Sequence, residues 1–255
     1  MMRWKSWESK KIKYNLWYRK EHSKIFTLLW NILQEKSMRL VPLPNQKGED
    51  LLLDVGCGDG RYLVSSTNNK GFFSIGIDPN NEVSLVPAKK KIRQAGLDPF
   101  LIKSVGESIP IQRSIISVVL CNSALDHTLD PEKVLKEIYG TLRENGTLVV
   151  WQGVYRSVHS SHKTAEYETH LRTFTANDLV GMLNNSGFSI TSSIFLGCDL
   201  VPYSEANKSI LSKIPKFLNR ALPILLKIYL LSGKLLPTHA SIVMLQLKKT
   251  RTQIE

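Results

Sequence analysis

Cysteine is scarce in this sequence, and long apolar runs are lacking near its start. The three cysteines among 255 residues, Cys57, Cys121 and Cys198, show no paired spacing and no metal-ligand cluster. This pattern predicts a reducing compartment and no structural zinc or other metal site. Charged residues fill the first 24 positions, and Asn31 interrupts the apolar stretch "IFTLLWNIL". We therefore expect no signal peptide and a cytoplasmic protein.

Acidic residues are also scarce at the two ends of the chain. Residues 1–24 contain eight Lys or Arg and two acids, and residues 206–255 contain nine Lys or Arg and one acid. Because the formal net charge of the whole chain is +12, residues 25–205 are close to neutral. The basic character therefore belongs to the ends, which predicts an anionic surface or polymer as a candidate partner.

The feature that is present is a glycine-rich turn in the stretch "LLLDVGCGDGRYL". Residues 51–55 predict a short buried strand, because they are apolar and lead into turn residues. Gly56, Gly58 and Gly60 let the backbone bend tightly and let a ligand approach closely. The helix expected after the turn offers free N–H groups to that ligand. This stretch therefore predicts a nucleotide-type binding loop.

Two carboxylates indicate which nucleotide. The spacing G-x-G-x-G differs from the dinucleotide fingerprint G-x-G-x-x-G, and Asp54 precedes the first glycine by two residues. An acid there favours a cationic ligand over a pyrophosphate. Asp78 ends a second predicted strand, where an acid can accept hydrogen bonds from both hydroxyls of a ribose. A ribose joined to a cationic amino acid with a sulfonium describes S-adenosylmethionine, which we predict as the cofactor.

Four stretches in order resemble the motifs of a known family. "LLLDVGCGDG", "IGID", "VVLCNSALDH" and "LRENGTLVV" are similar to motifs of class I S-adenosylmethionine-dependent methyltransferases, in the group named for methyltransferase type 11 domains. The resemblance runs from about residue 51 to 195, with a last strand near 241–247. It implies a doubly wound, mostly parallel α/β sheet of seven strands with a Rossmann-like methyltransferase fold. The seventh strand would be antiparallel, between the fifth and the sixth.

The alternation of strand and helix patterns predicts a parallel sheet covered on both faces. A helix is expected over 81–95, distorted at Pro87. A second begins after the cap Asp130 and ends near Gly146. A third runs from a capping box of Thr175 and Asp178 to residue 187. Strands are expected within 51–55, 73–78, 99–105, 114–122, 146–153, 188–195 and 241–247.

Two helical segments are expected to decorate this core. Residues 1–45 predict a basic, tryptophan-rich helical segment, which the resemblance places over the cofactor as a lid. Residues 46–197 form the predicted core, and residues 239–255 add its last strand and a tail. Residues 198–238 predict a basic, apolar helical insertion, broken by two prolines and too charged for a confident membrane span.

The insertion allows three functions. Its basic residues are spaced to line one helical face: Lys213, Lys216, Arg220, Lys227 and Lys234. It can be a cap packed on the active site, or residues 206–238 can lie on an anionic membrane at its inner face. The third option is RNA, bound with help from the aromatic, basic N-terminus.

The resemblance also implies which residues contact the cofactor. The sequence departs from the family at Val105, where an acid usually holds the adenine amino group. It also departs at Ser117, where an aspartate usually stands in the fourth strand. The Gly106 N–H and Glu107 are candidates for the adenine contact instead. The full set of expected cofactor contacts is Asp54, Gly56, Gly58, Gly60, Asp78, Gly106, Glu107 and Asn122.

Two histidines are candidate catalytic residues, because a base assists methyl transfer to a hydroxyl. His127 follows Asp126 after the fourth strand, where the alternative is a structural role in ordering the loop. His170 precedes the capping box, where it and Arg172 could face the acceptor.

We therefore predict a methyltransferase that acts on a small-molecule acceptor, by O-methylation, with an amphipathic or lipid-linked acceptor left open. The alternatives are an RNA (tRNA or rRNA) methyltransferase and a non-catalytic, cofactor-binding partner subunit. Retention of Asp54, the three glycines and Asp78 argues against the last.

Overall fold

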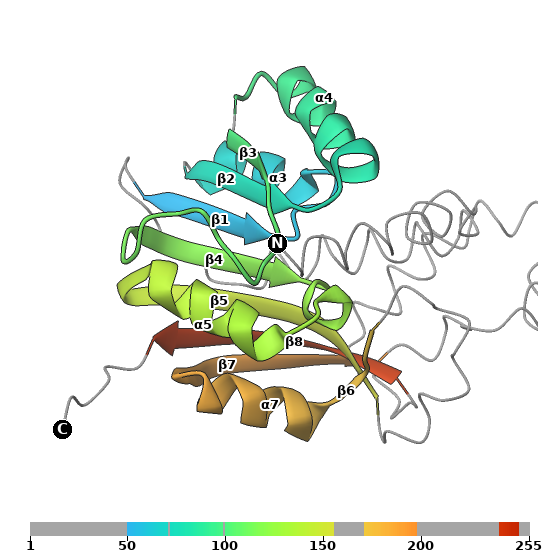
Figure 1. The fold of residues 1–255 in the computed structure, drawn as a ribbon, viewed down its shortest axis with the longest axis vertical. Coiled ribbons are helices and arrows are strands. Elements are labelled where there is room, and N and C mark those ends of the chain that lie inside the picture. Colours follow the sequence, from blue (N-terminus) through green and yellow to red (C-terminus); the bar gives the residue numbers. More distant parts are fainter. Residues whose placement is uncertain (1–49, 71, 99, 156–170, 198–239, 250–255) are drawn as a thin grey trace, which may run out of the picture.

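A computed structural model describes residues 50–70, 72–98, 100–155, 171–197 and 240–249 (Figure 1). The expected lid, the expected insertion and His170 lie outside these residues.

One sheet organises the described chain, and most of its strands are parallel (Figure 1). Its order is β3-β2-β1-β4-β5-β8-β7, and β8 runs antiparallel between β5 and β7. This confirms the doubly wound, Rossmann-like fold and the place of the last strand. A further two-residue strand, β6, pairs with β5 and was not expected. The strands are β1 (Leu51–Val55), β2 (Phe73–Asp78), β3 (Phe100–Lys103), β4 (Ile116–Asn122), β5 (Leu142–Tyr155), β6 (Phe174–Thr175), β7 (Phe188–Gly197) and β8 (Ala240–Lys249).

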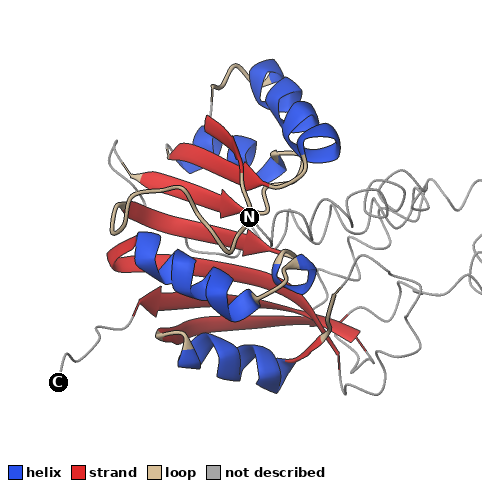
Figure 2. Cartoon of the chain, viewed as in Figure 1, coloured by secondary structure: helices blue, strands red, loops and turns tan. Residues whose placement is uncertain are grey.

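Helices cover both faces of the sheet (Figure 2). The α5 (Pro131–Thr141) and α7 (Ala176–Asn185) helices pack on one face, and α3 (Arg61–Lys70) and α4 (Val86–Gln94) pack on the other. The central strand β4 is apolar almost throughout because it is buried between both layers. Val119 belongs to the α5 side of the core and its neighbour Leu120 to the α4 side.

The direction of strand order reverses between β1 and β4. From β1 the chain winds outward to β2 and β3, and it then returns to β4 on the other side of β1. In open α/β sheets ligands bind at such a reversal, beyond the carboxyl ends of the strands. The fold therefore positions a binding crevice where β1, β2 and β4 end.

The second expected helix ends earlier than the sequence indicated. The α5 helix stops at Thr141, and β5 begins at Leu142 rather than at Gly146. Leu142 is fully buried and pairs with Ile116, so tertiary packing overrides the helical preference of the following residues. The pairing then shifts register before it resumes at Val118 and Thr147.

The distortion expected near Pro87 takes the form of a π-helical turn. This turn, η1 (Asn81–Leu85), directly precedes α4, which has the proline in its first turn. Proline lacks a backbone N–H, but the first N–H groups of a helix have no partner within the helix, so Pro87 costs no hydrogen bond there. Asn80 caps the turn by accepting hydrogen bonds from the N–H groups of Glu82 and Val83.

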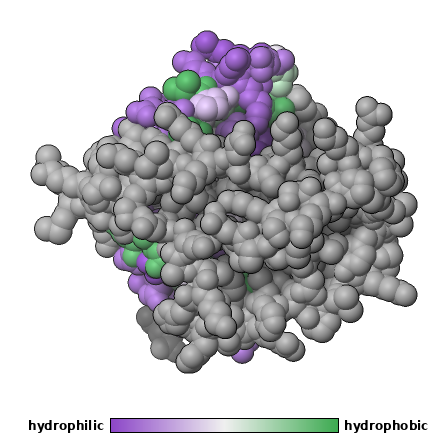
Figure 3. All heavy atoms as spheres, turned by 90° about the vertical axis from the view of Figure 1, so that its right-hand side faces the viewer, coloured by the Kyte–Doolittle hydropathy of each residue, from purple (hydrophilic) through white to green (hydrophobic). Residues whose placement is uncertain are grey.

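The described surface around α4 is mostly hydrophilic when viewed from the side on which β1 and β4 end (Figure 3). The helix exposes Lys89, Lys90 and Arg93. Among the described helices, none combines the length and the apolar character needed to cross a bilayer.

Candidate active site

A pocket lies at the reversal of strand order, beside the glycine-rich turn. Four segments that are distant in the sequence line it, each following the end of a strand. Their convergence shows that the sheet topology, rather than any single loop, builds the pocket. The lining residues are Val55, Gly56, Asp78, Pro79, Ser104, Val105, Gly106, Glu107, Ser123, Ala124, His127, Thr128 and Leu129.

Asp78 joins the end of β2 to the glycine-rich turn. Its Oδ2 accepts a hydrogen bond from the Gly58 N–H at 3.1 Å, and its Oδ1 accepts one from the Asn80 N–H at 2.8 Å. Burial raises the pKa of this carboxyl to about 6, although these N–H groups favour the ionised form. Each oxygen keeps a further lone pair, so the carboxylate can accept hydrogen bonds from two ribose hydroxyls.

Asp54 is an acid in the interior of the sheet. Its side chain is fully buried in β1, and neither carboxyl oxygen has a hydrogen-bond partner among the described residues. Burial first, and then the nearby carboxylates of Asp78 and Asp59, raises its pKa to about 8. A buried carboxylate without a partner is costly unless it takes up a proton or meets a cation. Asp54 does not line the pocket itself, but its neighbour Val55 does. This orphaned acid fits the cationic amino-acid end of S-adenosylmethionine.

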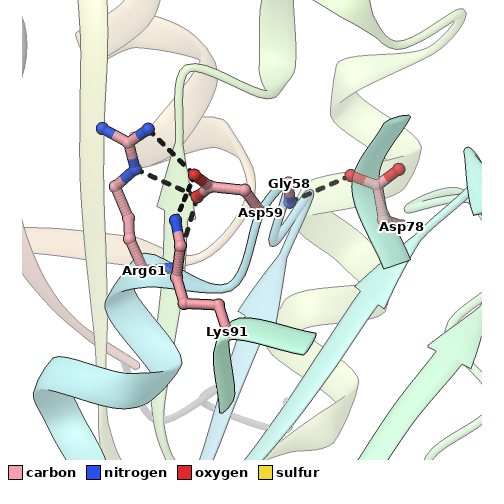
Figure 4. A network of polar contacts seen from close by, with 5 residues as sticks. All are labelled: Gly58, Asp59, Arg61, Asp78 and Lys91. Carbon is pink, nitrogen blue, oxygen red and sulfur yellow. Dashed lines mark hydrogen bonds and ion pairs between the residues drawn. The ribbon is translucent and has the colours of Figure 1, made fainter. Parts of the chain in front are cut away.

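An ion-pair network fastens the turn to the helical layer (Figure 4). Asp59 accepts a hydrogen bond from Arg61 Nε at 3.0 Å and pairs with the ammonium of Lys91 on α4. Burial alone would raise the pKa of Asp59, but the two cations outweigh it and hold the pKa below its ordinary value. Asp59 therefore fixes the turn to α4, and Asp78 fixes it to the end of β2.

The three glycines of the turn differ in the space that surrounds a side chain at each position. A Cβ on Gly56 would lie 2.7 Å from the Ala124 Cβ, and one on Gly60 would lie 3.0 Å from the Ala88 Cβ. These two are therefore required by packing. Among the residues that the structure describes, none has an atom within 4 Å of a Cβ on Gly58, although the φ of +53° still favours glycine there. The space beside Gly58 is open to a ligand.

The remaining residues expected to contact the cofactor are Gly106, Glu107 and Asn122, and only the first two line the pocket. Gly106 lines the pocket. Glu107 lines it too, but its Oε1 already accepts hydrogen bonds from the N–H groups of Leu129 and Asp130 at 2.7 and 3.2 Å. Asn122 ends β4 outside the pocket lining, and its buried Nδ2 has no partner in the described part of the chain.

His127 lines the pocket, and its Nε2 lies 3.9 Å from Asp126 Oδ1. This distance allows electrostatic attraction but exceeds a hydrogen bond. An imidazole on the pocket wall with a carboxylate behind it can accept a proton from a bound hydroxyl.

The structure gives partners for two polar residues that the sequence singled out. Arg172, which could face the acceptor, donates through its Nη2 to the carbonyl oxygens of Thr128 and Leu129. Ser117, where the family usually has an aspartate, lies near the amino end of β4 and donates to the Asp50 carboxylate. Ser117 does not line the pocket, so this difference from the family does not change the pocket lining.

Sequence reasoning missed the contacts of Asp59 and of Arg172. The Asp59 partner Lys91 is 32 residues away in the chain, and the partners of Arg172 are 44 and 43 residues away. No local pattern marks such pairs.

Comparison with known proteins agrees with the fold and with the order of the motifs. A family model described as "Methyltransferase domain" matches residues 53–150. A thiol S-methyltransferase, TMT1B, of Mus musculus is 27% identical over 122 residues, 48% of this chain and 50% of that protein. A tRNA U34 carboxymethyltransferase of Campylobacter jejuni is 26% identical over 110 residues, 43% of this chain and 37% of that protein. The chain thus spans half or less of the length of these relatives.

A crystal structure of geranyl diphosphate C-methyltransferase from Streptomyces coelicolor A3(2), in complex with Mg²⁺, geranyl diphosphate and S-adenosyl-L-homocysteine, has the same fold. It superimposes with a TM-score of 0.65 at 16% identity and covers 91% of this chain and 86% of that one. The motif order, the sheet and the family match agree. Residues 53–150 therefore match a class I methyltransferase domain, and the cofactor of that domain is S-adenosylmethionine.

Proposed function

We propose that this protein transfers a methyl group from S-adenosylmethionine to an oxygen atom of a small-molecule acceptor. The observation that carries the proposal is the pairing of two acids at the reversal of strand order. Asp54 is a buried carboxyl without a hydrogen-bond partner, and Asp78 is a carboxyl anchored to the glycine-rich turn. One suits a cation and the other suits a diol, and the cofactor has both.

The chain's residues contribute mainly by binding and orientation. Asp54 would hold the ammonium group, Asp78 the ribose, and residues around Gly106 the adenine. S-adenosylmethionine supplies a methyl group already activated by its sulfonium. Holding the acceptor oxygen close to and in line with that methyl group can lower the barrier by about 7–11 kcal/mol.

His127 supports oxygen as the acceptor atom. In the proposed reaction a C–O bond forms as the C–S bond breaks, and the C–S electron pair stays on sulfur to give a neutral thioether. The hydroxyl proton passes to the imidazole of His127, with Asp126 stabilising the imidazolium that results. A thiol acceptor would need this base less, because a thiol ionises more easily than an alcohol.

The proposal is tested by measuring S-adenosylhomocysteine formation with panels of hydroxylated small molecules, including amphipathic ones. With an accepted substrate, we expect His127→Gln to lower kcat by about 10²–10⁴-fold while cofactor affinity changes little. Full activity of this variant would exclude His127 as the base, and product formation only with thiols would exclude an oxygen acceptor.

RNA is the second candidate acceptor. Two observations favour it: the basic ends of the chain and the likeness to a tRNA-modifying enzyme. Against it, the described part of the chain is close to neutral. Methyl transfer to bulk tRNA or rRNA, and not to small molecules, would support this alternative.

A further inference from the structure

Glu107 and Arg172 approach the same stretch of backbone from opposite sides. Glu107 Oε1 accepts hydrogen bonds from the N–H groups of Leu129 and Asp130 at 2.7 and 3.2 Å. Arg172 Nη2 donates to the carbonyl oxygens of Thr128 and Leu129 at 3.0 and 2.8 Å. The Glu107 carboxylate therefore accepts hydrogen bonds from the N–H groups of this backbone, and the Arg172 guanidinium donates to its carbonyl oxygens.

These four hydrogen bonds fall on two consecutive peptide groups. The Thr128 carbonyl and the Leu129 N–H belong to one peptide group, and the Leu129 carbonyl and the Asp130 N–H belong to the next. In each group the C=O points to the guanidinium and the N–H to the carboxylate. Hydrogen bonds to charged groups are stronger than neutral ones, and aligned chains of them polarise one another. Glu107 and Arg172 thus interact through two peptide dipoles, an arrangement we call the Glu107–Arg172 bridge.

The bridged backbone is a wall of the candidate cofactor pocket. Thr128 and Leu129 line the pocket, and so does Glu107, which comes from the loop after β3. Leu129 and Arg172 also line a second cleft of about 580 Å³ on the side of α5 and α7. The bridge therefore fixes a partition between two cavities. A backbone N–H of the neighbouring residue, Leu171, adds a hydrogen bond to the Asp126 carbonyl at 2.8 Å.

We propose that Glu107 and Arg172 are positioning residues, which set the pocket wall for the cofactor through this bridge and do not contact the cofactor by charge. The inference rests on the proposed function, because the pocket is taken as the cofactor site. It assigns Glu107 a different role from a direct adenine contact. If Glu107 held the adenine amino group directly, removing its carboxylate would weaken cofactor binding even if the backbone stayed in place.

Substitutions at both ends test the bridge, with calorimetric affinity for S-adenosylhomocysteine as the measurement. Glu107→Gln keeps a carbonyl oxygen for the two N–H groups, so we expect affinity to fall about two- to threefold. Glu107→Ala leaves both N–H groups without a partner, and we expect a loss of about tenfold or more. Arg172→Met should weaken binding about tenfold, and Arg172→Lys should restore part of it because an ammonium can reach both carbonyls.

A double-mutant cycle tests the coupling between the two ends. Because each charge strengthens the bonds of the other, the Glu107→Gln and Arg172→Met changes together should cost less than the product of their separate fold-changes. Arg143→Met is the matched control. Arg143 pairs with Asp50 at 2.6 Å, at the opposite end of the sheet, so its loss should leave cofactor affinity unchanged.

Three results would overturn the proposal. They are wild-type affinity in Arg172→Met, equal losses in Arg172→Met and Arg143→Met, and losses in the Glu107→Gln and Arg172→Met pair that multiply without coupling. The last would show that Glu107 acts independently of Arg172, as a direct adenine contact would. A folded wild-type protein that fails to bind S-adenosylhomocysteine would instead overturn the proposed function, and the positioning role with it.

Discussion

The Gly58 N–H donates to Asp78 Oδ2 at 3.1 Å, which ties the glycine-rich turn to the end of the neighbouring strand. Cofactor recognition and loop geometry thus share one carboxylate. The same loop is fastened outward through Asp59 to Lys91 on α4 (Figure 4). The turn is therefore set in place before a ligand arrives, which lowers the ordering cost of binding.

Alanine at Gly58 and alanine at Gly56 should fail in different ways. Gly58→Ala places a methyl group in space that is open to a ligand, so cofactor affinity should fall at least tenfold. Its positive φ adds a stability cost of about 1–2 kcal/mol. Gly56→Ala pays a similar backbone cost and also places its Cβ 2.7 Å from the Ala124 Cβ, so its stability should fall further. Urea unfolding and calorimetry on the same variants measure both quantities.

Gly181→Ala is the control for the glycine pair. Gly181 lies within α7, where an added Cβ meets no atom of the described segments within 4 Å, so neither binding nor folding should suffer. Unchanged cofactor affinity in Gly58→Ala would show that the ligand does not approach this side of the turn.

Cofactor affinity should rise with pH between about 6 and 8. The Asp54 carboxyl, with its pKa raised to about 8, is mostly protonated at neutral pH. A cationic ligand group needs the ionised form, so binding below pH 8 releases a proton. Affinity should then increase by up to about tenfold per pH unit and level off above pH 8. Calorimetry in buffers of different ionisation enthalpy counts the protons released.

Asp54→Asn is the matching variant, because it keeps the size of the side chain and removes the titration. Its residual affinity should be weaker and independent of pH over this range. If the wild-type heat of binding is identical in all buffers, no proton leaves Asp54 and the ammonium group is held elsewhere.

Asp59→Asn should weaken the fold modestly and only above acidic pH. The pKa of Asp59 is held below its ordinary value, so its contribution is present above pH 4 and is lost as pH falls through the lowered value. Since its partners are partly exposed, we expect a loss of up to about 1 kcal/mol in the free energy of unfolding at pH 7. Asp98→Asn, in the loop after α4 where the side chain is exposed, is the control. A difference that persists unchanged at pH 2 would mean that charge is not the cause.

The basic insertion, which lies outside the described residues, predicts binding to anionic vesicles. Each Lys or Arg near such a surface contributes about 1 kcal/mol, and salt screens it. Replacing Lys213, Lys216 and Arg220 by Gln should reduce sedimentation with anionic vesicles and leave cofactor affinity intact. Equal binding to neutral vesicles would rule out this electrostatic mechanism. RNA binding that weakens linearly in log affinity with log salt would support the alternative acceptor.

Much of the fold could be predicted because its signals are local. The capping box of Thr175 and Asp178 forms as expected, and the apolar run of β4 lies buried between two helical layers. The misplaced end of α5 shows where local signals fail. The stretch after Thr141 has helix-forming residues up to Gly146, but Leu142 gains more from pairing with Ile116 in the sheet.

The site was predictable to the extent that it follows strand ends. Asp54, Gly58 and Asp78 could be named from one turn and one strand. The contacts of Glu107 and Arg172 could not, because they meet only through a backbone segment that belongs to neither neighbourhood. Such a relationship depends on how the loops after β3 and β4 and the start of β6 fold together.

The most direct test of the account is a calorimetric titration of the intact protein with S-adenosylhomocysteine, beside the Asp78→Ala variant. We expect one site per chain with micromolar affinity in the wild type, and no measurable binding in the variant although it remains folded. A folded wild-type protein that gives no binding heat at any pH between 6 and 9, or an Asp78→Ala variant that binds equally well, would contradict the account.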